Sequence, residues 1–238
     1  INLCGAFRNM QALHVAGARI VAEEAQAAGA SALVHISAIG ADPEADSDYG
    51  RTKGEGESAV RDAFAGATIV RPSLVFGAED SLTNRFAALG RLPIVPVLAS
   101  RTRFQPVFVR DLAQAIVAAA LDQLAHGSKT YEIGGPQVLS MIELHRAIYA
   151  VTGQTPDLIQ LPHVAGTALS KLGFLPGAPL TRDQWVMLQH DNVASQGTLG
   201  LADFGIEPTP LGAVAGEWLA RFRSAKHAGR RSALNATA

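Results

Sequence analysis

The chain lacks several features that would place it in a specialised class of protein. It has one cysteine, Cys4, which excludes an internal disulfide and suits a reducing compartment. No apolar run approaches the ~18 residues that a transmembrane helix needs. The net charge is only −1, which argues against a nucleic-acid binder, and the seven histidines show no metal-ligand spacing. We therefore expect no nucleic-acid partner, no membrane span and no metal.

The sequence also lacks a conventional beginning. It starts with Ile1 rather than methionine, and residues 1–4 read as the end of a strand. No signal-peptide pattern explains this start, so we expect the N-terminus to be truncated. The 238 residues, of which 48% are hydrophobic and 17% charged, suffice to bury a core as one domain, with or without a smaller appendage.

Helical and strand patterns alternate in the first third of the chain. Apolar residues at helical spacing predict a helix over 9–28, which Gly29 ends, and a second helix over 48–64. Two almost continuously apolar runs, at 32–37 and 67–72, predict strands buried on both faces. This alternation predicts an α/β fold, a doubly wound parallel sheet with right-handed crossovers.

After Pro72 the alternation becomes less regular. We expect a short helix at 82–89, a strand at 105–109 that leads into a helix at 110–124, and a strand at 129–135. Two capping boxes predict helix starts, namely Ser140 with Glu143 and Thr181 with Gln184. A last helix is expected over about 210–223, and residues 224–238 lack an apolar period and read as a disordered tail.

One tyrosine and one lysine stand out, because the chain has only three tyrosines and four lysines. Tyr49 and Lys53 are four residues apart and so share one face of the predicted helix. An ammonium group beside a phenol favours the phenolate, which is what a general acid–base serving a carbonyl/alcohol couple needs. Ser37 ends the preceding strand, and the carboxyl ends of parallel strands open onto the ligand crevice. Ser37, Tyr49 and Lys53 are therefore candidate catalytic residues. The alternative is that Tyr49 caps its helix and Lys53 is merely solvated.

Several segments carry these residues in a familiar order. Ser37, "YGRTK", "IVRPSLVFG" and "QPVFVRDLAQAI" resemble the extended and atypical short-chain dehydrogenase/reductase superfamily over residues 1 to about 223. Within it, "INLCG", "PLTRDQWVMLQHDNV" and "LADFGIEPTPL" resemble the family of NADPH-binding accessory subunits of respiratory complex I. The resemblance implies a Rossmann-like fold, with its first strands missing from this chain, and a small C-terminal α/β substrate-type domain.

The resemblance also implies roles for individual residues. Asn2 and Leu3 would end a strand beside the nicotinamide ribose, Tyr49 and Lys53 would contact that ribose, and Pro72 and Ser73 would lie near the nicotinamide. The implied cofactor is NADP(H) rather than NAD(H), although the residues that normally decide this choice are not in the chain. The glycine-rich phosphate-binding turn of the superfamily is also missing, and neither "GEGE" nor "IGG" follows a strand into a helix as that turn does.

Two functions follow from the resemblance. One is an accessory subunit that holds NADPH as a structural ligand and docks on complex I at the membrane surface, in the cytoplasm and peripheral to the inner membrane. The other is a working oxidoreductase or epimerase that uses Ser37, Tyr49 and Lys53. The implied domains are residues 1–77, the C-terminal part of the dinucleotide-binding domain, and 78–223, a mixed region. In the latter, 105–125 returns to the Rossmann core and the remainder forms the small C-terminal domain.

Other polar residues have both structural and functional interpretations. We expect His35 to be a structural histidine with its hydrogen bonds satisfied, and Asp111 to be structural. Arg71 would pair with a carboxylate or reach the ligand. Asn84, Arg101, Arg103 and Gln105 would overhang the crevice, or belong to a solvated loop. The apolar segment 163–180 would pack on the C-terminal domain or dock on a membrane-embedded partner. The basic tail, with Lys226, Arg230 and Arg231, would be mobile or touch acidic lipid.

Overall fold

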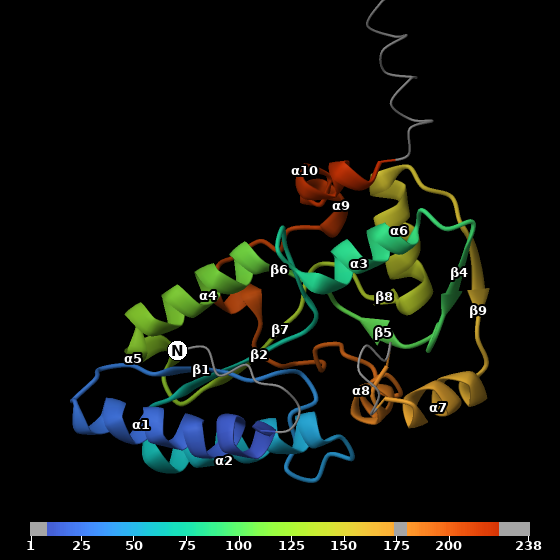
Figure 1. The fold of residues 1–238 in the computed structure, drawn as a ribbon. Coiled ribbons are helices and arrows are strands. Elements are labelled where there is room, and N and C mark those ends of the chain that lie inside the picture. The colour runs from blue at the N-terminus through green and yellow to red at the C-terminus, as the bar shows by residue number, and fades with distance from the viewer. Residues whose placement is uncertain (1–8, 174–179, 224–238) are drawn as a thin grey trace, which may run out of the picture.

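A three-stranded parallel sheet forms the centre of the larger part of the molecule (Figure 1). The computed structural model describes residues 9–173 and 180–223. The strands are β1 (Val34–Ile36), β2 (Thr68–Pro72) and β7 (Thr130–Ile133), and β2 lies between the other two. Val34 pairs with Thr68, and Ile69 with Thr130, both in parallel register. The predicted parallel sheet is confirmed.

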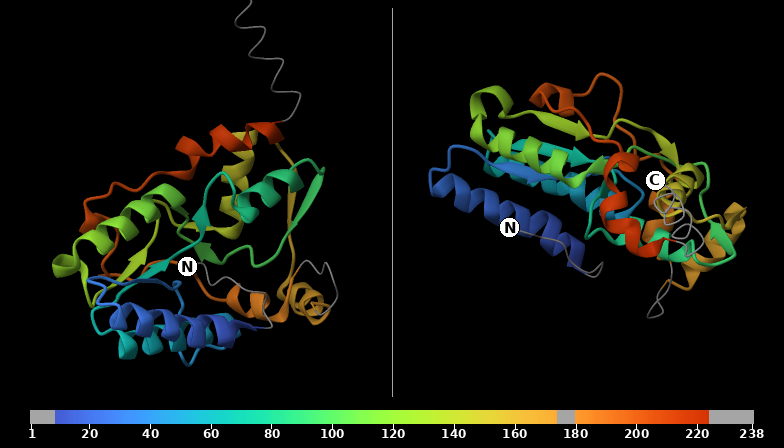
Figure 2. Two further views of the ribbon diagram at one scale, coloured as in Figure 1. Left: turned by 60° about the vertical axis from the view of Figure 1, so that its left-hand side comes forward. Right: turned by 90° about the horizontal axis from the view of Figure 1, so that it is seen from above.

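Helices cover both faces of this sheet, as Figures 1 and 2 show. On one face lie the π-helix η2 (Gln11–Gly17), α1 (Ala18–Ala27), which continues it, and α2 (Asp48–Ala63); α4 (Val109–Leu121) lies on the other. Adjacent residues of β2 point to opposite faces, because Ile69 packs with Ala22 and Val60 while Val70 packs with Leu112 and Tyr131. The sheet is doubly wound, as predicted.

The remaining elements gather beside the sheet (Figure 1). Three two-stranded ribbons are β3 (Val75–Phe76) with β6 (Val107–Phe108), β4 (Ile94–Val97) with β9 (Asp157–Gln160), and β5 (Arg103–Phe104) with β8 (Leu139–Ser140). The helical elements are α3 (Ser81–Leu89), α5 (Gln123–His126), α6 (Met141–Thr152), α7 (His163–Lys171), α8 (Arg182–Met187), η3 (Leu201–Phe204), α9 (Leu211–Val214), α10 (Gly216–Leu219) and η4 (Ala220–Phe222). A second apolar core around Phe76, Leu144, Ile148 and Leu219 joins β3, β6, α3, α6, α9 and α10. The proposed domain boundaries remain a prediction.

The local signals in the sequence predict helix ends well. Both capping boxes are present, and Gly153 ends α6 with a φ of 66°, in the left-handed region. Three predictions need correction. The strand expected at 105–109 has only the residues Val107–Phe108, because the side chain and backbone of Gln105 bond elsewhere. The last helix is divided into three short pieces, and Gly212 and Gly216, which lie in them, are poor helix formers.

The third correction concerns β1, which is not buried on both faces. It is shorter than the predicted strand, and Ile36 is 36% exposed. Within the described residues β1 lies at the edge of its sheet and pairs only with β2, so it has one neighbour where a central strand has two. A continuously apolar sequence therefore indicated the strand but not its surroundings.

The glycines of α2 have a packing role that the sequence did not reveal. A Cβ added at Gly54 would lie 2.4 Å from the carbonyl carbon of Asp42, and one at Gly56 would lie 2.2 Å from the carbonyl oxygen of His14. These distances are too short for any side chain. The "GEGE" segment therefore lets α2 approach both η2 and the loop that follows β1, at the expense of about 1 kcal/mol of helix propensity per glycine.

Replacing Gly56 tests this close approach. Gly56→Ala should destabilise the protein by about 1–3 kcal/mol despite the better helix propensity of alanine, because the backbone of His14 has to move. The control is Gly212→Ala, where an added Cβ meets nothing within 4 Å. It should leave the free energy of unfolding unchanged or slightly higher. Urea denaturation of both variants gives the comparison, and equal stabilities would contradict the proposed packing.

Candidate active site

The candidate site lies where β1 ends and α2 begins. Ser37 follows β1 directly, and α2 starts at Asp48 after Ser47, whose Oγ accepts a hydrogen bond from the N–H of Gly50 at 3.0 Å. Lys53 reaches back across this junction, since its Nζ donates to the carbonyl oxygen of Ile36 at 2.9 Å. Lys53 and Ser37 therefore meet at the carboxyl end of the same strand, and Tyr49 lies one helical turn before Lys53.

Ser37 is a buried hydroxyl without a hydrogen-bond partner. Ser37 is only 3% exposed, and its Oγ has no hydrogen-bond partner in the described part of the chain. Its backbone N–H, in contrast, donates to the carbonyl of Val70 at 2.7 Å. A buried hydroxyl left unpaired costs about 1–3 kcal/mol. Such an atom next to a Tyr–Lys helix face fits a ligand that supplies the missing hydrogen bond.

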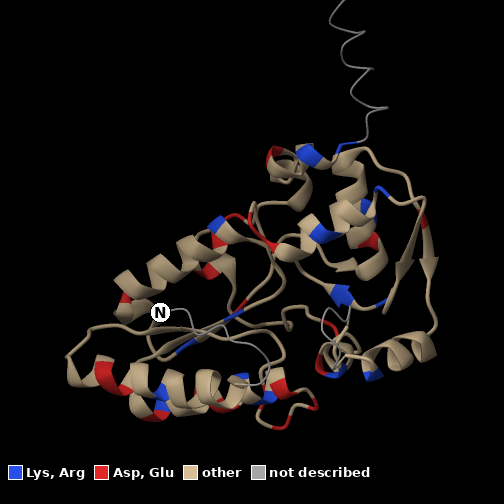
Figure 3. Cartoon of the chain, viewed as in Figure 1, with Lys and Arg blue, Asp and Glu red and all other residues tan. Residues whose placement is uncertain are grey.

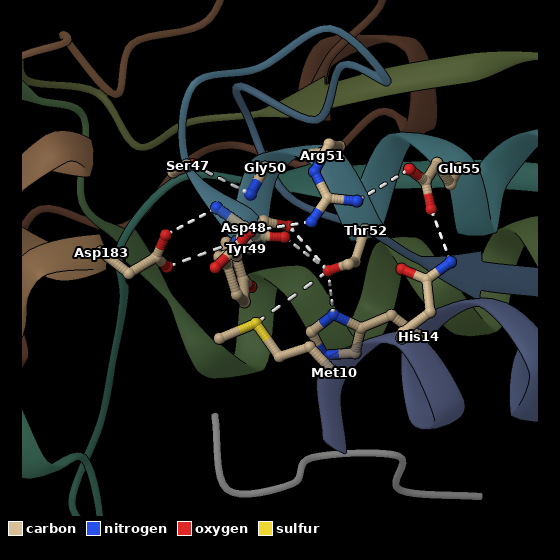
Figure 4. A network of polar contacts seen from close by, with 11 residues as sticks. Met10, His14, Ser47, Asp48, Tyr49, Gly50, Arg51, Thr52, Glu55 and Asp183 are labelled. Carbon is tan, nitrogen blue, oxygen red and sulfur yellow. Dashed lines mark hydrogen bonds and ion pairs between the residues drawn. The ribbon is translucent and has the colours of Figure 1, made fainter. Parts of the chain in front are cut away.

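The N-terminus of α2 is held by a carboxylate from a distant segment (Figure 4). Asp183 of α8 accepts from the N–H of Asp48 at 2.6 Å and from the N–H of Tyr49 at 3.3 Å. A carboxylate there satisfies exposed amides and complements the positive end of the helix dipole. The sequence reasoning missed Asp183, because its position in the "PLTRDQW" segment gives no hint of where α8 packs.

A small buried network lies on the opposite side of Tyr49 (Figure 4). The Nδ1 of His14 lies 2.9 Å from the Oγ1 of Thr52, and Thr52 Oγ1 donates to the carbonyl of Asp48 at 2.7 Å. The ring of His14 meets the ring of Tyr49 edge-on, with centroids 5.6 Å apart. These contacts fix the Tyr49 ring from the η2 side. The expectation that Tyr49 caps its helix is wrong, because Ser47 is the N-cap, and Lys53 donates a hydrogen bond to a backbone carbonyl.

Two histidines that lie within the electrostatic influence of Lys53 have lowered pKa values. Burial, followed by the charge of Lys53, lowers the pKa of His35 to about 4 and also lowers the pKa of His14. The Nε2 of His35 is buried with no partner among the described residues. We expected His35 to have all its hydrogen bonds satisfied. That expectation is wrong, because its Nε2 has no hydrogen-bond partner among the described residues.

Pro72 ends the central strand β2, and Ser73 follows it, at the carboxyl end of the sheet where Ser37 also lies. The carbonyl of Pro72 accepts from the N–H of Ile39 at 3.1 Å. Ser73 Oγ lies 2.7 Å from both the carbonyl and the side-chain oxygen of Asn192, and it accepts from the N–H of Gln105 at 3.2 Å. The Ser73 hydroxyl is thus engaged within the protein, and Asn192 is a site-edge residue that the sequence reasoning missed. Asn2 and Leu3 lie outside the described residues.

Arg71 turns out to pair with carboxylates. Its Nε and Nη2 each donate to one oxygen of Glu57 at 2.8 Å, and its Nη1 lies 3.5 Å from Glu132. Glu57 is only 1% exposed, so this bidentate pair is a buried link between α2 and β2. The hydrogen bonds that Arg71 donates to Glu57 are the main reason that the pKa of Arg71 is raised. Of the two interpretations of Arg71, the structural one holds.

Most of the other polar residues singled out from the sequence also bond within the protein. Asp111 is 6% exposed and accepts from the N–H and hydroxyl of Thr209, which supports its expected structural role. Arg103 pairs with Asp191, whose pKa it lowers. Asn84 and Gln105 bond to neighbouring backbone and side-chain groups, whereas Arg101 is exposed. Lys226, Arg230 and Arg231 lie outside the described residues.

Acidic and basic residues both occur over the ribbon, and α2 carries residues of both signs (Figure 3). Within residues 9–173 and 180–223, no three His, Cys, Asp or Glu side chains form a group that could hold a metal ion. A search of the same residues finds no helix with the length and apolarity to cross a membrane.

Comparison with known proteins gives a family and several relatives. Residues 7–173 match the family described as RmlD substrate binding domain. The chain is 34% identical over 210 residues to the Mus musculus protein named NADH dehydrogenase (ubiquinone) 1 alpha subcomplex subunit 9, mitochondrial, a match covering 87% of this chain and 55% of the mouse protein. It is 34% identical over 147 residues to the ceramide reductase of Caulobacter vibrioides, covering 61% of this chain and 46% of that protein. The chain thus spans about half the length of the curated relatives it matches.

The fold is shared with solved structures. The NADPH-dependent quinone oxidoreductase QOR2 of Escherichia coli, solved with NADPH, superimposes with a TM-score of 0.64 and 22% identity, covering 84% of this chain and 70% of that one. This likeness confirms the predicted Rossmann-like fold.

The Asp183 contact can be tested by substitution. Asp183→Ala removes an N-terminal helix cap and should cost about 1 kcal/mol of the free energy of unfolding. Asp183→Asn keeps an oxygen acceptor and should cost clearly less. The midpoint of urea unfolding distinguishes the two. An Ala variant as stable as the parent would show that the carboxylate does not hold α2.

The lowered pKa of His35 predicts a pH dependence of stability. Because the folded pKa, about 4, lies below the unfolded value of 6.5, the unfolded state binds more protons between these values. The stabilisation is therefore complete above about pH 6.5 and is lost as the pH falls toward 4, at no more than about 1.4 kcal/mol per pH unit. His35→Leu should unfold with a weaker pH dependence than the parent between pH 6.5 and 5. Parallel curves for the two proteins would contradict a neutral buried His35.

Proposed function

The chain belongs to the RmlD substrate binding domain family, and we propose that it is a nicotinamide-dinucleotide-binding protein of the complex I accessory-subunit type. In this proposal the dinucleotide is a structural ligand, held where β1 ends and α2 begins. The observation that carries the proposal is the position of Lys53, whose ammonium group is fixed at 2.9 Å from the carbonyl of Ile36, beside the unpaired hydroxyl of Ser37.

The residues at this junction fit such a ligand. Lys53 and Tyr49 lie on one face of α2 and would hold the ribose, Pro72 and Ser73 would lie near the nicotinamide, and Asn2 and Leu3 would close the site from the preceding strand. The buried Ser37 Oγ offers a hydroxyl that no described residue uses. When bound, a nicotinamide dinucleotide supplies hydride-transfer chemistry. The contribution of this chain is to bind and orient it.

The extent of similarity favours the accessory type. The match to the mouse complex I subunit runs over 87% of this chain, whereas the match to the ceramide reductase runs over 61%. A tightly bound nucleotide stabilises the native state by mass action, with no turnover required. We propose NADP(H) rather than NAD(H) as the ligand, complex I subunits as partners, and a position on the cytoplasmic surface of the inner membrane.

An active oxidoreductase or epimerase is the second candidate. It is favoured by the three residue types at the site, since Ser37 could orient a substrate carbonyl while Tyr49 transferred the proton and Lys53 supported it. Ribose binding would also account for Tyr49 and Lys53, so their presence does not decide between the candidates. What separates them is whether a bound nucleotide exchanges and reacts.

The experiment uses the natural full-length protein, purified without added nucleotide and then denatured. Mass spectrometry identifies the released nucleotide, and the native protein is tested for its exchange and for its oxidation with a panel of carbonyl compounds. Stoichiometric NADPH that neither exchanges nor reacts supports the accessory type. Free exchange with oxidation supports the enzyme. A protein that retains no nucleotide and also fails to bind added NADPH or NADH contradicts both candidates.

Substitution of Lys53 tests the site itself. Lys53→Met should reduce the nucleotide retained through purification, with affinity weakened about tenfold or more, because a charged hydrogen-bond donor is removed. Lys129→Met is the control, since Lys129 is exposed and precedes β7, at the opposite edge of the sheet. Equal nucleotide content in the two variants would place the dinucleotide elsewhere.

A further inference from the structure

A second pocket lies away from β1 and α2, between α7 and α8. Its volume is about 390 Å³, within the range of small-molecule sites. Helix α7 contributes His163, Thr167 and Lys171 to its lining, α8 contributes Arg182 and Trp185, and Gln189 follows α8. Trp185 is only 5% exposed and packs against Gly166, where an added Cβ would lie 2.2 Å from the indole ring. The two helices therefore hold a rigid aromatic wall.

The polar atoms of the wall are bonded to one another. Trp185 Nε1 donates to Thr167 Oγ1 at 3.2 Å, and His163 Nε2 lies 3.1 Å from Gln189 Oε1. Ser170, which also lines the pocket, donates its hydroxyl to the carbonyl of Thr167 at 3.0 Å. With these groups satisfied, the wall presents mainly carbon atoms to a ligand. An apolar group would lose no hydrogen bonds on entering.

The charges of the pocket are of one sign and lie at its rim. Lys171 and Arg182 are both exposed, no acidic residue is in the lining, and neither cation makes an ion pair with any described residue. The acid next to Arg182 is Asp183, and its carboxylate is bonded to the backbone of α2. Figure 3 marks basic positions on both helices. A ligand with an anionic group would therefore meet two cations that form no ion pair within residues 9–173 and 180–223.

From this combination we propose that the pocket binds an anionic amphiphile, with an acyl chain against Trp185 and a carboxylate or phosphate between Lys171 and Arg182. The shared chemistry is one apolar chain ending in one anion, which a fatty acid or the monomeric form of an anionic lipid provides. The proposal is independent of the dinucleotide site, since none of the lining residues belongs to it.

The test uses dodecanoate below its micellar concentration and the fluorescence of Trp185. The chain has two tryptophans, so Trp218→Phe leaves Trp185 as the sole reporter. Saturable one-to-one binding with a change in Trp185 emission is expected, with dodecyl phosphate binding similarly and dodecanol at least about tenfold more weakly. Calorimetry on the protein without the Trp218 substitution checks the stoichiometry.

Variants distinguish binding in the pocket from nonspecific binding elsewhere on the surface. The double variant K171Q/R182Q should weaken dodecanoate binding about tenfold or more, and Val186→Phe, which fills the pocket, should abolish it. The control R85Q/K129Q removes two exposed cations outside the pocket and should bind as the parent does. All four positions are on the surface, so thermal unfolding should confirm that both double variants fold.

Three results would overturn the proposal. In the first, dodecanoate shows no saturable binding. In the second, dodecanoate and dodecanol bind equally and K171Q/R182Q leaves both affinities unchanged. In the third, the protein binds phosphatidylglycerol vesicles but not monomeric dodecanoate. The last would mean that the two helices meet a membrane surface rather than hold one molecule in the pocket.

Discussion

The site depends on how closely helix α2 approaches its neighbours. At Gly56 the backbone of η2 comes so near that a Cβ would lie 2.2 Å from the carbonyl oxygen of His14, and at Gly54 the loop after β1 is equally tight. Because no side chain separates these backbones, α2 has one position available to it. That position brings Lys53 to the end of β1 and places Tyr49 one turn earlier, against the ring of His14.

Contacts from three directions then hold the helix in this place. Asp183 binds the first amides of α2, Glu57 forms a buried bidentate pair with Arg71 of β2, and Lys53 bonds to the carbonyl of Ile36. Of the five buried polar side-chain atoms that have no hydrogen-bond partner among the described residues, two, Ser37 Oγ and His35 Nε2, belong to β1 and the residue after it. Unpaired buried polar atoms at the end of a strand are a feature that a binding site would explain.

The sequence predicted the local features well and the long-range ones poorly. The alternation of elements, both capping boxes and the placing of Ser37 at the end of a strand follow from spacing alone. The exposure of Ile36 does not, because burial depends on which strand lies alongside. Asp183 and Asn192 were missed for the same reason, since each acts across more than a hundred residues of sequence. From the sequence, the glycines of α2 could be compared only with a phosphate-binding turn, which they do not match. Close packing of two backbones requires glycine just as such a turn does, so the residue type alone does not distinguish the two.

The central claim is that the edge formed by β1 and α2 holds a nicotinamide dinucleotide. The most direct measurement is an experimental structure of the natural protein, isolated from its source organism with no nucleotide added. The account predicts density for a dinucleotide whose ribose lies within hydrogen-bonding distance of Lys53 Nζ and the Tyr49 hydroxyl. An empty edge, or a nucleotide bound elsewhere on the molecule, would contradict it.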